Sequence, residues 1–502
     1  MCGFVTGNIF KDTKHFHAAL SLIDHRGRDS KGVNYSIKTD TYLGHNRLSI
    51  QGLTEEANQP MVKDSYILVY NGELWHSMNP HKSKFDLHTG SDTELLLNMF
   101  HLDQEDCIKT LDGMFGFAVL DEEKKKLTFA RDFMGRIPLY FFKKGKEIIV
   151  ASELKAITNS LNINASDVIL ADPGCYYEFD YVTGELMKTK FYEFPAMDDI
   201  EDMKEEEVID GIRDLLTEGV HNELISDVPV CTILSGGVDS TIITYLLKQE
   251  IPDLQAFVVS VGDTGKKDDL YYARMASKEI GVPLHEVIID EEWVEQNMSE
   301  AVYAVEDYNW TQVSPAVAQL ALSKRIHEEG FKVVFGGEGS DELFASYGHV
   351  FAWNYKDKDY IKERYKLVVN LHKNNLIRTN KAMMYGGTVE LRTPFLHKDL
   401  VEFCLRIHPD HKATSQNKIW KPMLRKAFSG KLSNELLFRP KKTFQDGCHT
   451  IYLKNHKERI KESYLSHYEQ RNPLESFFGS PECRSGGTLS RGLTFQKSML
   501  YL

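Results

Sequence analysis

The stretch Val228-Pro229-Val230-Cys231-Thr232-Ile233-Leu234-Ser235-Gly236-Gly237-Val238-Asp239-Ser240 joins an apolar run to a loop rich in glycine and serine. The apolar run has the length of a buried strand. Glycines let a backbone approach a phosphate closely, and serine hydroxyls with successive N–H groups bind anions where a helix begins. The stretch therefore predicts a nucleotide-binding loop, although it lacks the GxxxxGKS/T pattern of a Walker loop. A plain strand-to-helix turn is the alternative, because glycines favour that as well.

Strand and helix patterns alternate on the C-terminal side of this loop. A helix is expected from about residue 241 and another at 271–280, between strands at 256–261, 285–289 and 332–335. Such alternation predicts an α/β domain with a parallel sheet covered by helices and with phosphate loops at the carboxyl ends of its strands. Beyond residue 345 the pattern is mostly helical.

The N-terminal part of the chain has a different pattern. Short strands such as 66–70 and 115–120 alternate with turn-rich loops, and helical patterns occur only near 15–23 and 93–100. A strongly acidic stretch at 197–207 with few apolar residues separates the two patterns. The predicted limits are 1–193 for the first domain, 194–206 for a linker, 207–470 for the second domain and 471–502 for a loose C-terminal tail.

Composition limits the class of protein. The 502 residues are enough for two or more domains, and the net charge of -13 argues against nucleic-acid binding. No apolar run approaches the ~18 residues needed to cross a bilayer, and no signal peptide is evident. The seven scattered cysteines have no CxxC pair or metal-ligand spacing. These features predict a cytoplasmic protein with free thiols and no membrane partner.

The second residue is a candidate nucleophile. If Met1 is removed, Cys2 carries both a thiol and an α-amine with a reference pKa of about 7.7–8.0, which can act as the base. Asn71-Gly72 is expected to end a strand, where it can offer a side-chain and a backbone N–H to an oxyanion. Arg47 can clamp a substrate carboxylate. Taken singly, these features also fit ordinary roles, since Asn-Gly is typical of hairpin turns.

Several such motifs occur in one order and together resemble a known family. The series resembles the N-terminal-nucleophile glutamine amidotransferase domain, and most closely that of glutamine-hydrolysing asparagine synthetases, although Arg28 replaces the family's usual proline. The resemblance implies a four-layer αββα fold, a cysteine that attacks glutamine at Cys2, oxyanion donors at Asn71 and Gly72, and glutamine-binding roles for Arg47, Glu73 and Asp92. The motifs are Met1-Cys2-Gly3-Phe4, His25-Arg26-Gly27, Leu43-Gly44-His45-Asn46-Arg47-Leu48-Ser49-Ile50, Asn58-Gln59-Pro60-Met61, Tyr70-Asn71-Gly72-Glu73 and Ser91-Asp92-Thr93-Glu94.

The C-terminal half resembles the synthetase part of the same family. Its first loop resembles the pyrophosphatase loop of ATP-dependent adenylating enzymes, and Gly337-Glu338-Gly339-Ser340-Asp341-Glu342 and Arg439-Pro440-Lys441-Lys442-Thr443-Phe444 match later family motifs. The resemblance implies ATP and Mg²⁺ as cofactors, Asp239 and Asp341 as metal ligands, and Glu338 and Lys441 as catalytic residues. The implied ATP-binding residues are Leu234, Ser235, Gly236, Gly237, Asp239, Ser240 and Gly337.

The expected activity is an ATP-dependent carbon–nitrogen ligase with small-molecule substrates, namely glutamine, aspartate and ATP. In it, glutamine supplies ammonia to β-aspartyl-AMP. A different acceptor carboxylate is the alternative, because segment 307–315 lacks the arginine of the family's acceptor half and His397 replaces a common aspartate. A catalytically silent sensor of glutamine or nucleotide is a third interpretation. The assembly is left open, with a homodimer among the possibilities.

Overall fold

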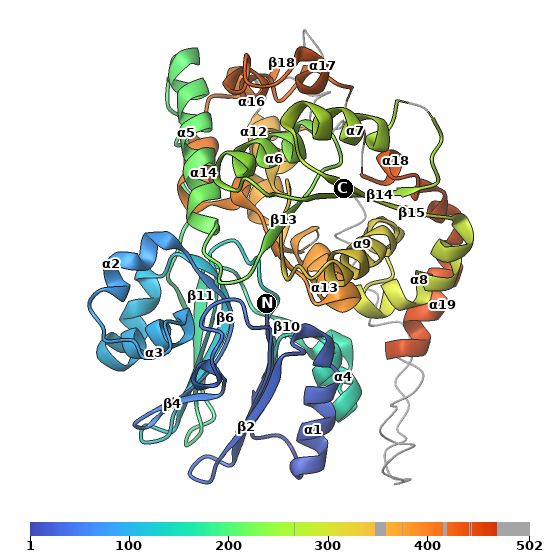
Figure 1. Cartoon of the computed structure of the whole chain (residues 1–502). Helices are drawn as coiled ribbons and strands as arrows, with labels where there is room; N and C mark the ends of the chain where they lie inside the picture. Colours follow the sequence, from blue (N-terminus) through green and yellow to red (C-terminus); the bar gives the residue numbers. More distant parts are fainter. Residues whose placement is uncertain are drawn as a thin grey trace.

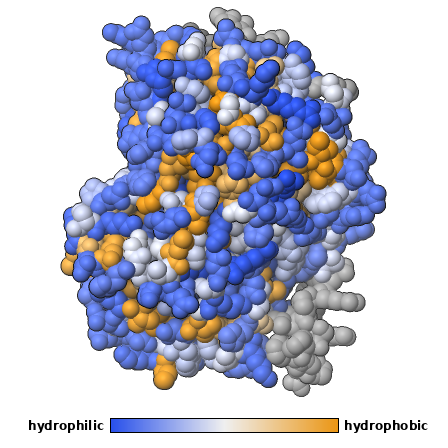
Figure 2. Space-filling view, viewed as in Figure 1, coloured by the Kyte–Doolittle hydropathy of each residue, from blue (hydrophilic) through white to orange (hydrophobic). Residues whose placement is uncertain are grey.

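The computed structural model describes residues 1–265, 267–346, 358–373, 375–414, 419–440, 442 and 444–468. The predicted tail and the catalytic candidate Lys441 lie outside them. Figure 1 shows two parts that follow each other along the chain, with the N-terminus where they meet. The face in Figure 2 is mainly hydrophilic and carries separate hydrophobic patches. No helix within the described ranges has the length and apolar character of a membrane span.

The first part contains two sheets of six strands each, and every pairing in them is antiparallel. The first sheet has the order β10 (Ile169–Leu170), β8 (Tyr140–Lys144), β9 (Glu147–Ala151), β1 (Gly3–Gly7), β3 (Thr41–Arg47), β2 (Ser30–Ser36). The second has the order β12 (Leu186–Lys190), β11 (Cys175–Asp180), β7 (Lys126–Arg131), β6 (Gly113–Asp121), β5 (Tyr66–Leu74), β4 (Met61–Lys63).

The two sheets pack face to face, and helices cover their outer faces. Phe4 and Leu43 of one sheet and Phe129 of the other share the buried core between them. Helices α1 (Thr13–Ser21) and α4 (Lys155–Leu161) pack on the first sheet, while α3 (Asp92–Asp103) packs on the second. Every residue of β6 is buried, as expected of a strand covered on both faces. The predicted αββα class is confirmed.

Both helices expected in this part are present with shifted ends. The N-terminus of α3 lies at Asp92 because the Ser91 hydroxyl caps it by accepting the Glu94 N–H. Asp12 caps α1 in the same way through the N–H of His15. These local signals fix the start of each helix, and the short helix α2 (Asn79–Lys82) precedes α3 along the chain.

The second part is built on a parallel sheet, as predicted. Its order is β15 (Leu284–Ile289), β14 (Ala256–Val261), β13 (Val230–Ile233), β16 (Val333–Phe335), β17 (Glu390–Arg392), and all four pairings are parallel. Buried side chains on α6 and α7 cover one face of the sheet, and those on α8 and α9 cover the other. The helices here are α5 (Glu205–Glu223), α6 (Val238–Glu250), α7 (Asp269–Ile280), α8 (Glu291–Val305) and α9 (Trp310–Glu328).

The described residues beyond 345 are mostly helical, which confirms the prediction for them. The helices are α12 (Lys358–Val369), α13 (Asn375–Gly387), α14 (Lys398–Arg406), α15 (Pro409–Lys412), α16 (Pro422–Ala427), α17 (Asn434–Leu437), α18 (Phe444–Gly447) and α19 (Lys457–Tyr468), and the short α10 (Ser340–Leu343) precedes them. Two very short strands, β18 (Ala413–Thr414) and β19 (Ile419–Trp420), pair with each other.

The two parts share a buried interface. Trp75 and Met114 of the first part belong to the same apolar cluster as Ile212 of α5. Arg136 and Glu223 form a buried bidentate ion pair across it, at 2.8 and 2.7 Å. Helix α5 begins at residue 205, slightly before the predicted end of the linker. The division of the chain into 1–193, 194–206 and 207–470 stays a prediction.

Candidate functional site

Cys2 directly precedes β1 and lies beside the end of β3. Its Sγ accepts the Leu48 N–H at 3.4 Å and lies 3.6 Å from the Leu48 carbonyl oxygen. Burial raises the pKa of the Cys2 thiol to about 11, although the terminal ammonium and Arg47 act in the opposite direction. The terminal ammonium belongs to Met1 and pairs with Glu390 at 2.8 Å. With Met1 in place, the thiol is therefore protonated at neutral pH.

The structure corrects one expectation about Asn71-Gly72. These residues do not end a strand, because β5 continues to Leu74 and pairs with β6 as far as Gly113. A Cβ at position 72 would lie 2.2 Å from the Met114 carbonyl oxygen, so only glycine fits there. Within the described chain, neither Oδ1 nor Nδ2 of the buried Asn71 has a hydrogen-bond partner. Buried amides are normally paired, so this side chain is available to a ligand.

Arg47 at the end of β3 is buried and held by the loop that follows it. Its guanidinium donates to the carbonyl oxygen of Thr54 at 2.9 Å, to Asn58 Oδ1 at 2.8 Å and to the carbonyl oxygens of Gln51 and Gly52. Arg47 is therefore not part of a surface ion pair, which is the usual role of a single arginine. The side chain is fixed in orientation beside the thiol, whose pKa it lowers.

The two predicted acidic ligands lie close to the end of β5, Glu73 within the strand and Asp92 beside it. Asp92, the first residue of α3, accepts hydrogen bonds from the Tyr70 hydroxyl at 2.9 Å and the Leu74 N–H at 3.0 Å. Glu73 accepts the Gln51 side-chain amide at 2.5 Å. Burial, with Glu390 and Asp92 nearby, raises the pKa of Glu73 well above its ordinary value. An ammonium group placed between these carboxyls would be favoured.

The predicted nucleotide loop lies between β13 and α6, at the carboxyl end of the central strand. Leu234 is buried in the core, and the chain turns at Gly236, whose φ is +68°. A Cβ at 236 would lie 2.4 Å from the Tyr272 carbonyl carbon, so glycine lets α7 pack against the loop. Ser235 Oγ contacts Ser240 Oγ at 3.1 Å and accepts the Gly237 N–H at 3.3 Å.

The second acidic motif lies against this loop. A Cβ at Gly337 would lie 2.8 Å from Asp239 Cβ, and Ser340 Oγ donates to Asp239 at 2.7 Å. The structure thus brings the predicted ligands Asp239 and Asp341 together on one cation, because Lys421 Nζ lies 2.6 Å from both carboxylates. Two hard carboxylates that share a cation fit Mg²⁺. No cluster of three or more His, Cys, Asp or Glu with metal-ligand geometry occurs in the described segments.

Glu338 stands three positions before the predicted ligand Asp341 in the sequence. Its Oε2 is buried and has no hydrogen-bond partner among the described residues. Burial raises the pKa of Glu338, and the charge of Arg378 opposes this shift. A carboxylate of raised pKa is suited to exchange protons near neutral pH.

Sequence reasoning assigned no role to Lys421 or to Arg439. Nothing in the sequence around Lys421 marks it, since its partner Asp239 lies far away in the chain. Arg439 belongs to the late motif, and it donates to the Ser235 carbonyl oxygen at 3.0 Å and to Asp269 at 2.5 Å. It therefore ties the loop to α7. His397, which replaces the family's common aspartate, has its Nε2 atom 3.2 Å from Nδ2 of Asn222 in α5.

Comparisons with known proteins agree with this arrangement. A glutamine amidotransferase domain matches residues 1–185, and asparagine synthase matches residues 211–367 and 355–482. The chain belongs to the family of glutamine-hydrolysing asparagine synthetases. Both family models fall on the parts that carry Cys2 and the nucleotide loop, which confirms the resemblance seen in the motifs.

Relatives in this family cover nearly the whole chain. The chain is 30% identical over 489 residues to a probable asparagine synthetase [glutamine-hydrolyzing] of Schizosaccharomyces pombe, with 89% of this chain and 85% of the relative covered. It is 29% identical over 464 residues to asparagine synthetase B [glutamine-hydrolyzing] of Escherichia coli, with 87% of this chain and 80% of the relative covered.

Among solved structures, the chain is similar to an allosteric regulatory enzyme of purine biosynthesis. The identity is 16% and the TM-score 0.34, with 57% of this chain and 80% of that chain covered.

Proposed function

We propose that the chain is a glutamine-dependent asparagine synthetase. It would convert ATP, L-aspartate, L-glutamine and water into L-asparagine, L-glutamate, AMP and pyrophosphate. The observation that carries the proposal is the pair of family matches, a glutamine amidotransferase domain over one part and asparagine synthase over the other. Membership of this family also supports ATP as the nucleotide.

The first part would release ammonia from glutamine. After removal of Met1, the α-amine of Cys2 takes the thiol proton, and the sulfur attacks the side-chain amide carbon. The unpaired Asn71 Nδ2 and the Gly72 N–H are the proposed donors to the oxyanion. Collapse of the intermediate leaves a γ-glutamyl thioester and ammonia, and water then hydrolyses the thioester to glutamate.

Glutamine would be held by the charged groups around this strand. Arg47 is proposed to bind its α-carboxylate, and Glu73 and Asp92 its α-ammonium. The bound ammonium would stabilise the charged form of both acids and so lower their pKa values from the raised values that burial gives them. Binding of glutamine would therefore add a second positive charge beside Glu73, whose carboxylate already lies 3.6 Å from Arg392.

The second part would activate the acceptor carboxylate. The loop from Ser235 to Ser240 is proposed to hold the pyrophosphate portion of ATP. Asp239 and Asp341 would hold Mg²⁺, with the Lys421 ammonium keeping the two carboxylates in position. When bound, Mg²⁺ would neutralise the negative charge of the ATP phosphates. Glu338 would accept a proton as ammonia attacks the acyl-adenylate. Lys441 remains a proposed catalytic residue from its motif alone.

Another acceptor carboxylate is the second candidate. The observation that favours it is segment 307–315, in which the expected arginine is missing. Asn309 in this segment caps α9 by accepting the Thr311 N–H at 3.1 Å, so these residues form the start of a helix. The missing arginine therefore concerns the start of α9, in the half proposed to bind the acceptor.

Mass spectrometry of products tests both candidates. The protein is incubated with ATP, glutamine and each of a panel of amino-acid carboxylates. Asparagine and AMP should form with aspartate, whereas amide formation only with another acid would select the second candidate. A Cys2→Ala variant is the matched control, because it should lose glutamine-dependent synthesis and keep ammonia-dependent synthesis. If no acid yields AMP and pyrophosphate, neither candidate holds.

A further inference from the structure

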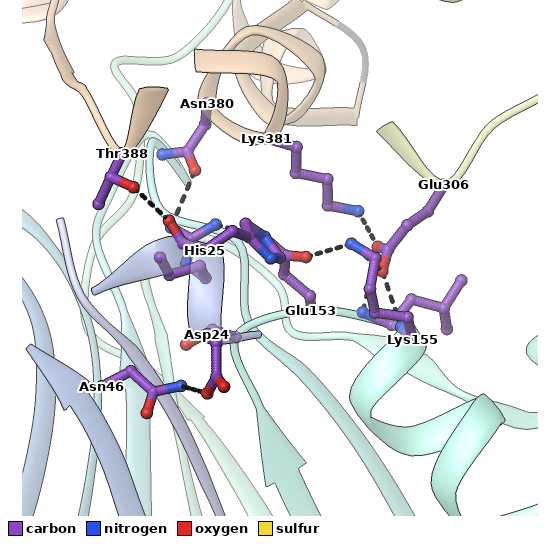
Figure 3. A network of polar contacts seen from close by, with 12 residues as sticks. Asp24, His25, Asn46, Glu153, Lys155, Glu306, Asn380, Lys381 and Thr388 are labelled. Carbon is purple, nitrogen blue, oxygen red and sulfur yellow. Dashed lines mark hydrogen bonds and ion pairs between the residues drawn. The ribbon is translucent and has the colours of Figure 1, made fainter. Parts of the chain in front are cut away.

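Helix α13 of the second part reaches into the first part through two neighbouring residues, Asn380 and Lys381. Figure 3 shows the Asn380 side chain directed toward the N-terminal part and the Lys381 side chain directed toward Glu306, which in turn contacts Lys155 of the N-terminal part. Asn380 and Lys381 are almost completely buried, with 4% and 1% of their surfaces exposed. Such buried contacts can fix the position of residues in the first part from the second part.

The partner of Asn380 is Arg26, which holds the backbone of the nucleophile. Arg26 is fully buried and donates from Nε to the Cys2 carbonyl oxygen at 2.8 Å. Its Nη1 donates to Glu153 at 2.7 Å, and its Nη2 donates to Asn380 Oδ1 at 3.1 Å. Each nitrogen of the guanidinium therefore has an acceptor, and one of the three comes from the second part.

A row of alternating charges keeps α13 in this position. Lys381 pairs with Glu306 and donates to the Tyr140 hydroxyl at 2.8 Å. Lys155 pairs with the same Glu306 at 3.2 Å and also with Glu153. Glu153 also pairs with Arg26, which ends the row. Opposite charges alternate along the row, so none of these buried charges lacks a partner of opposite sign.

The Asn380 amide is fixed on its other side as well. Its Nδ2 lies 2.9 Å from Met1 Sδ and donates to the Arg136 carbonyl oxygen at 3.3 Å. The second of these contacts does not depend on Met1 and would survive its removal. The orientation of the amide, with Oδ1 toward Arg26, is therefore set by contacts on both ends.

We propose that Asn380 is a positioning residue for the glutamine reaction at Cys2, supplied by the synthetase half. The inference rests on the proposed function. Asn380 holds Arg26, and Arg26 holds the Cys2 carbonyl and with it the thiol. Loss of the Asn380 acceptor leaves a buried guanidinium N–H unpaired, which favours a shift of Arg26. A displacement of about 1 Å at a reacting group can reduce a rate about 10²-fold.

The test uses the full-length protein and two substitutions at one site. Asn380→Leu keeps the shape and removes the acceptor, whereas Asn380→Asp keeps the acceptor for Arg26. Thr388→Val is the matched control, because the buried Thr388 hydroxyl also bridges the two parts, to the His25 carbonyl oxygen at 2.8 Å, without touching Arg26. Glutamate release without ATP, ammonia-dependent synthesis and the thermal unfolding midpoint are measured for each.

The expected result separates positioning from interface stability. Asn380→Leu should lower kcat for glutamate release by about tenfold or more, with KM changed by less than about threefold. Ammonia-dependent synthesis should be unchanged, and Asn380→Asp and Thr388→Val should stay within about threefold of wild type in kcat. Alkylation of Cys2 by a glutamine-analogue diazoketone should slow in parallel with kcat in Asn380→Leu.

Other results would overturn the inference. Wild-type glutamate release by Asn380→Leu, an equal loss in Thr388→Val, or a parallel loss of ammonia-dependent synthesis would reduce Asn380 to an interface contact. If Asn380→Leu does not fold, Asn380→Ala replaces it, since it adds no volume, with the same expected outcomes. A wild-type protein that releases no glutamate at all would instead contradict the proposed function, on which this inference rests.

Discussion

Lys421 places its side-chain nitrogen 2.6 Å from each of the two carboxylate oxygens of Asp239. The lysine side chain is completely buried, whereas the aspartate is 20% exposed. Burial alone would lower the pKa of Lys421, but Asp239 and Asp341 outweigh it and raise the pKa above the ordinary value. The lysine is therefore charged, and it holds the two proposed metal ligands together.

Replacement of Lys421 by methionine should impair the synthetase reaction alone. Without the ammonium, the two carboxylates repel each other, and the geometry that Mg²⁺ and ATP require is lost. We expect Lys421→Met to lower ammonia-dependent synthesis by about 10²-fold, as for loss of one preorganised charge, while glutamate release stays near wild type. Lys426→Met is the control, because Lys426 pairs with Glu205 at an exposed position. Wild-type synthesis by Lys421→Met would contradict this role.

Substitution of Asn71 should impair the glutamine reaction. Its amide is buried and unpaired among the described residues, which destabilises the free enzyme. A hydrogen bond from this amide to the oxyanion would therefore stabilise the transition state more than the free enzyme. We expect Asn71→Ala to lower kcat for glutamate release by about 10²–10³-fold and to leave ammonia-dependent synthesis intact. The exposed Asn79→Ala serves as control. A change confined to KM would assign Asn71 to ground-state binding instead.

The reactivity of Cys2 should depend on pH while Met1 is attached. Because burial raises the pKa of its thiol to about 11, the thiol is protonated at neutral pH. The thiolate fraction, and with it the rate of alkylation by iodoacetamide, should rise about tenfold per pH unit from about pH 7 to 9. The rates can be followed by peptide mass spectrometry at each pH. A flat profile would show that the thiol is already ionised in the untrimmed protein.

Removal of Glu306 should destabilise the whole protein. This buried carboxylate pairs with both Lys155 and Lys381 and accepts the N–H groups of Leu154 and Lys155 at 3.1 and 2.7 Å (Figure 3). Glu306→Ala would leave two buried ammonium groups with less compensation, at a cost of about 3–5 kcal/mol in the free energy of unfolding. Denaturant titration measures it. Glu300→Ala, which breaks the partly exposed pair with Lys324, should cost less than about 1 kcal/mol.

The elements that the sequence predicted correctly carry local signals. The apolar run before Ser235 and the glycines after it are contiguous, so the strand, the loop and the helix could be inferred together. The short β17 was not predicted, because Glu390–Arg392 contains two charged residues and no apolar run, and the strand exists through pairing with β16. The prediction that β5 ends at Asn71-Gly72 was wrong. The pair is typical of turns, but pairing with β6 extends the strand beyond it.

Site residues that depend on distant partners could not be predicted. Lys421 meets Asp239 across 182 positions in the chain, and Asn380 meets Arg26 across 354. No local pattern encodes such contacts. The candidate residues of the first part could be named from short motifs, since β1, β3 and β5 bring those motifs together. Their contacts, such as the carbonyl groups around Arg47, became evident only in the fold.

Transfer of labelled nitrogen from glutamine to asparagine tests whether the two parts of the protein work together. The protein is incubated with glutamine labelled with ¹⁵N in the side-chain amide, ATP and aspartate, in the presence of unlabelled ammonium. We expect asparagine that carries ¹⁵N in its amide, with one AMP formed for each asparagine. The Cys2→Ala variant should lose the label but still form asparagine. Asparagine without ¹⁵N in the wild type, or label transfer by Cys2→Ala, would contradict this expectation.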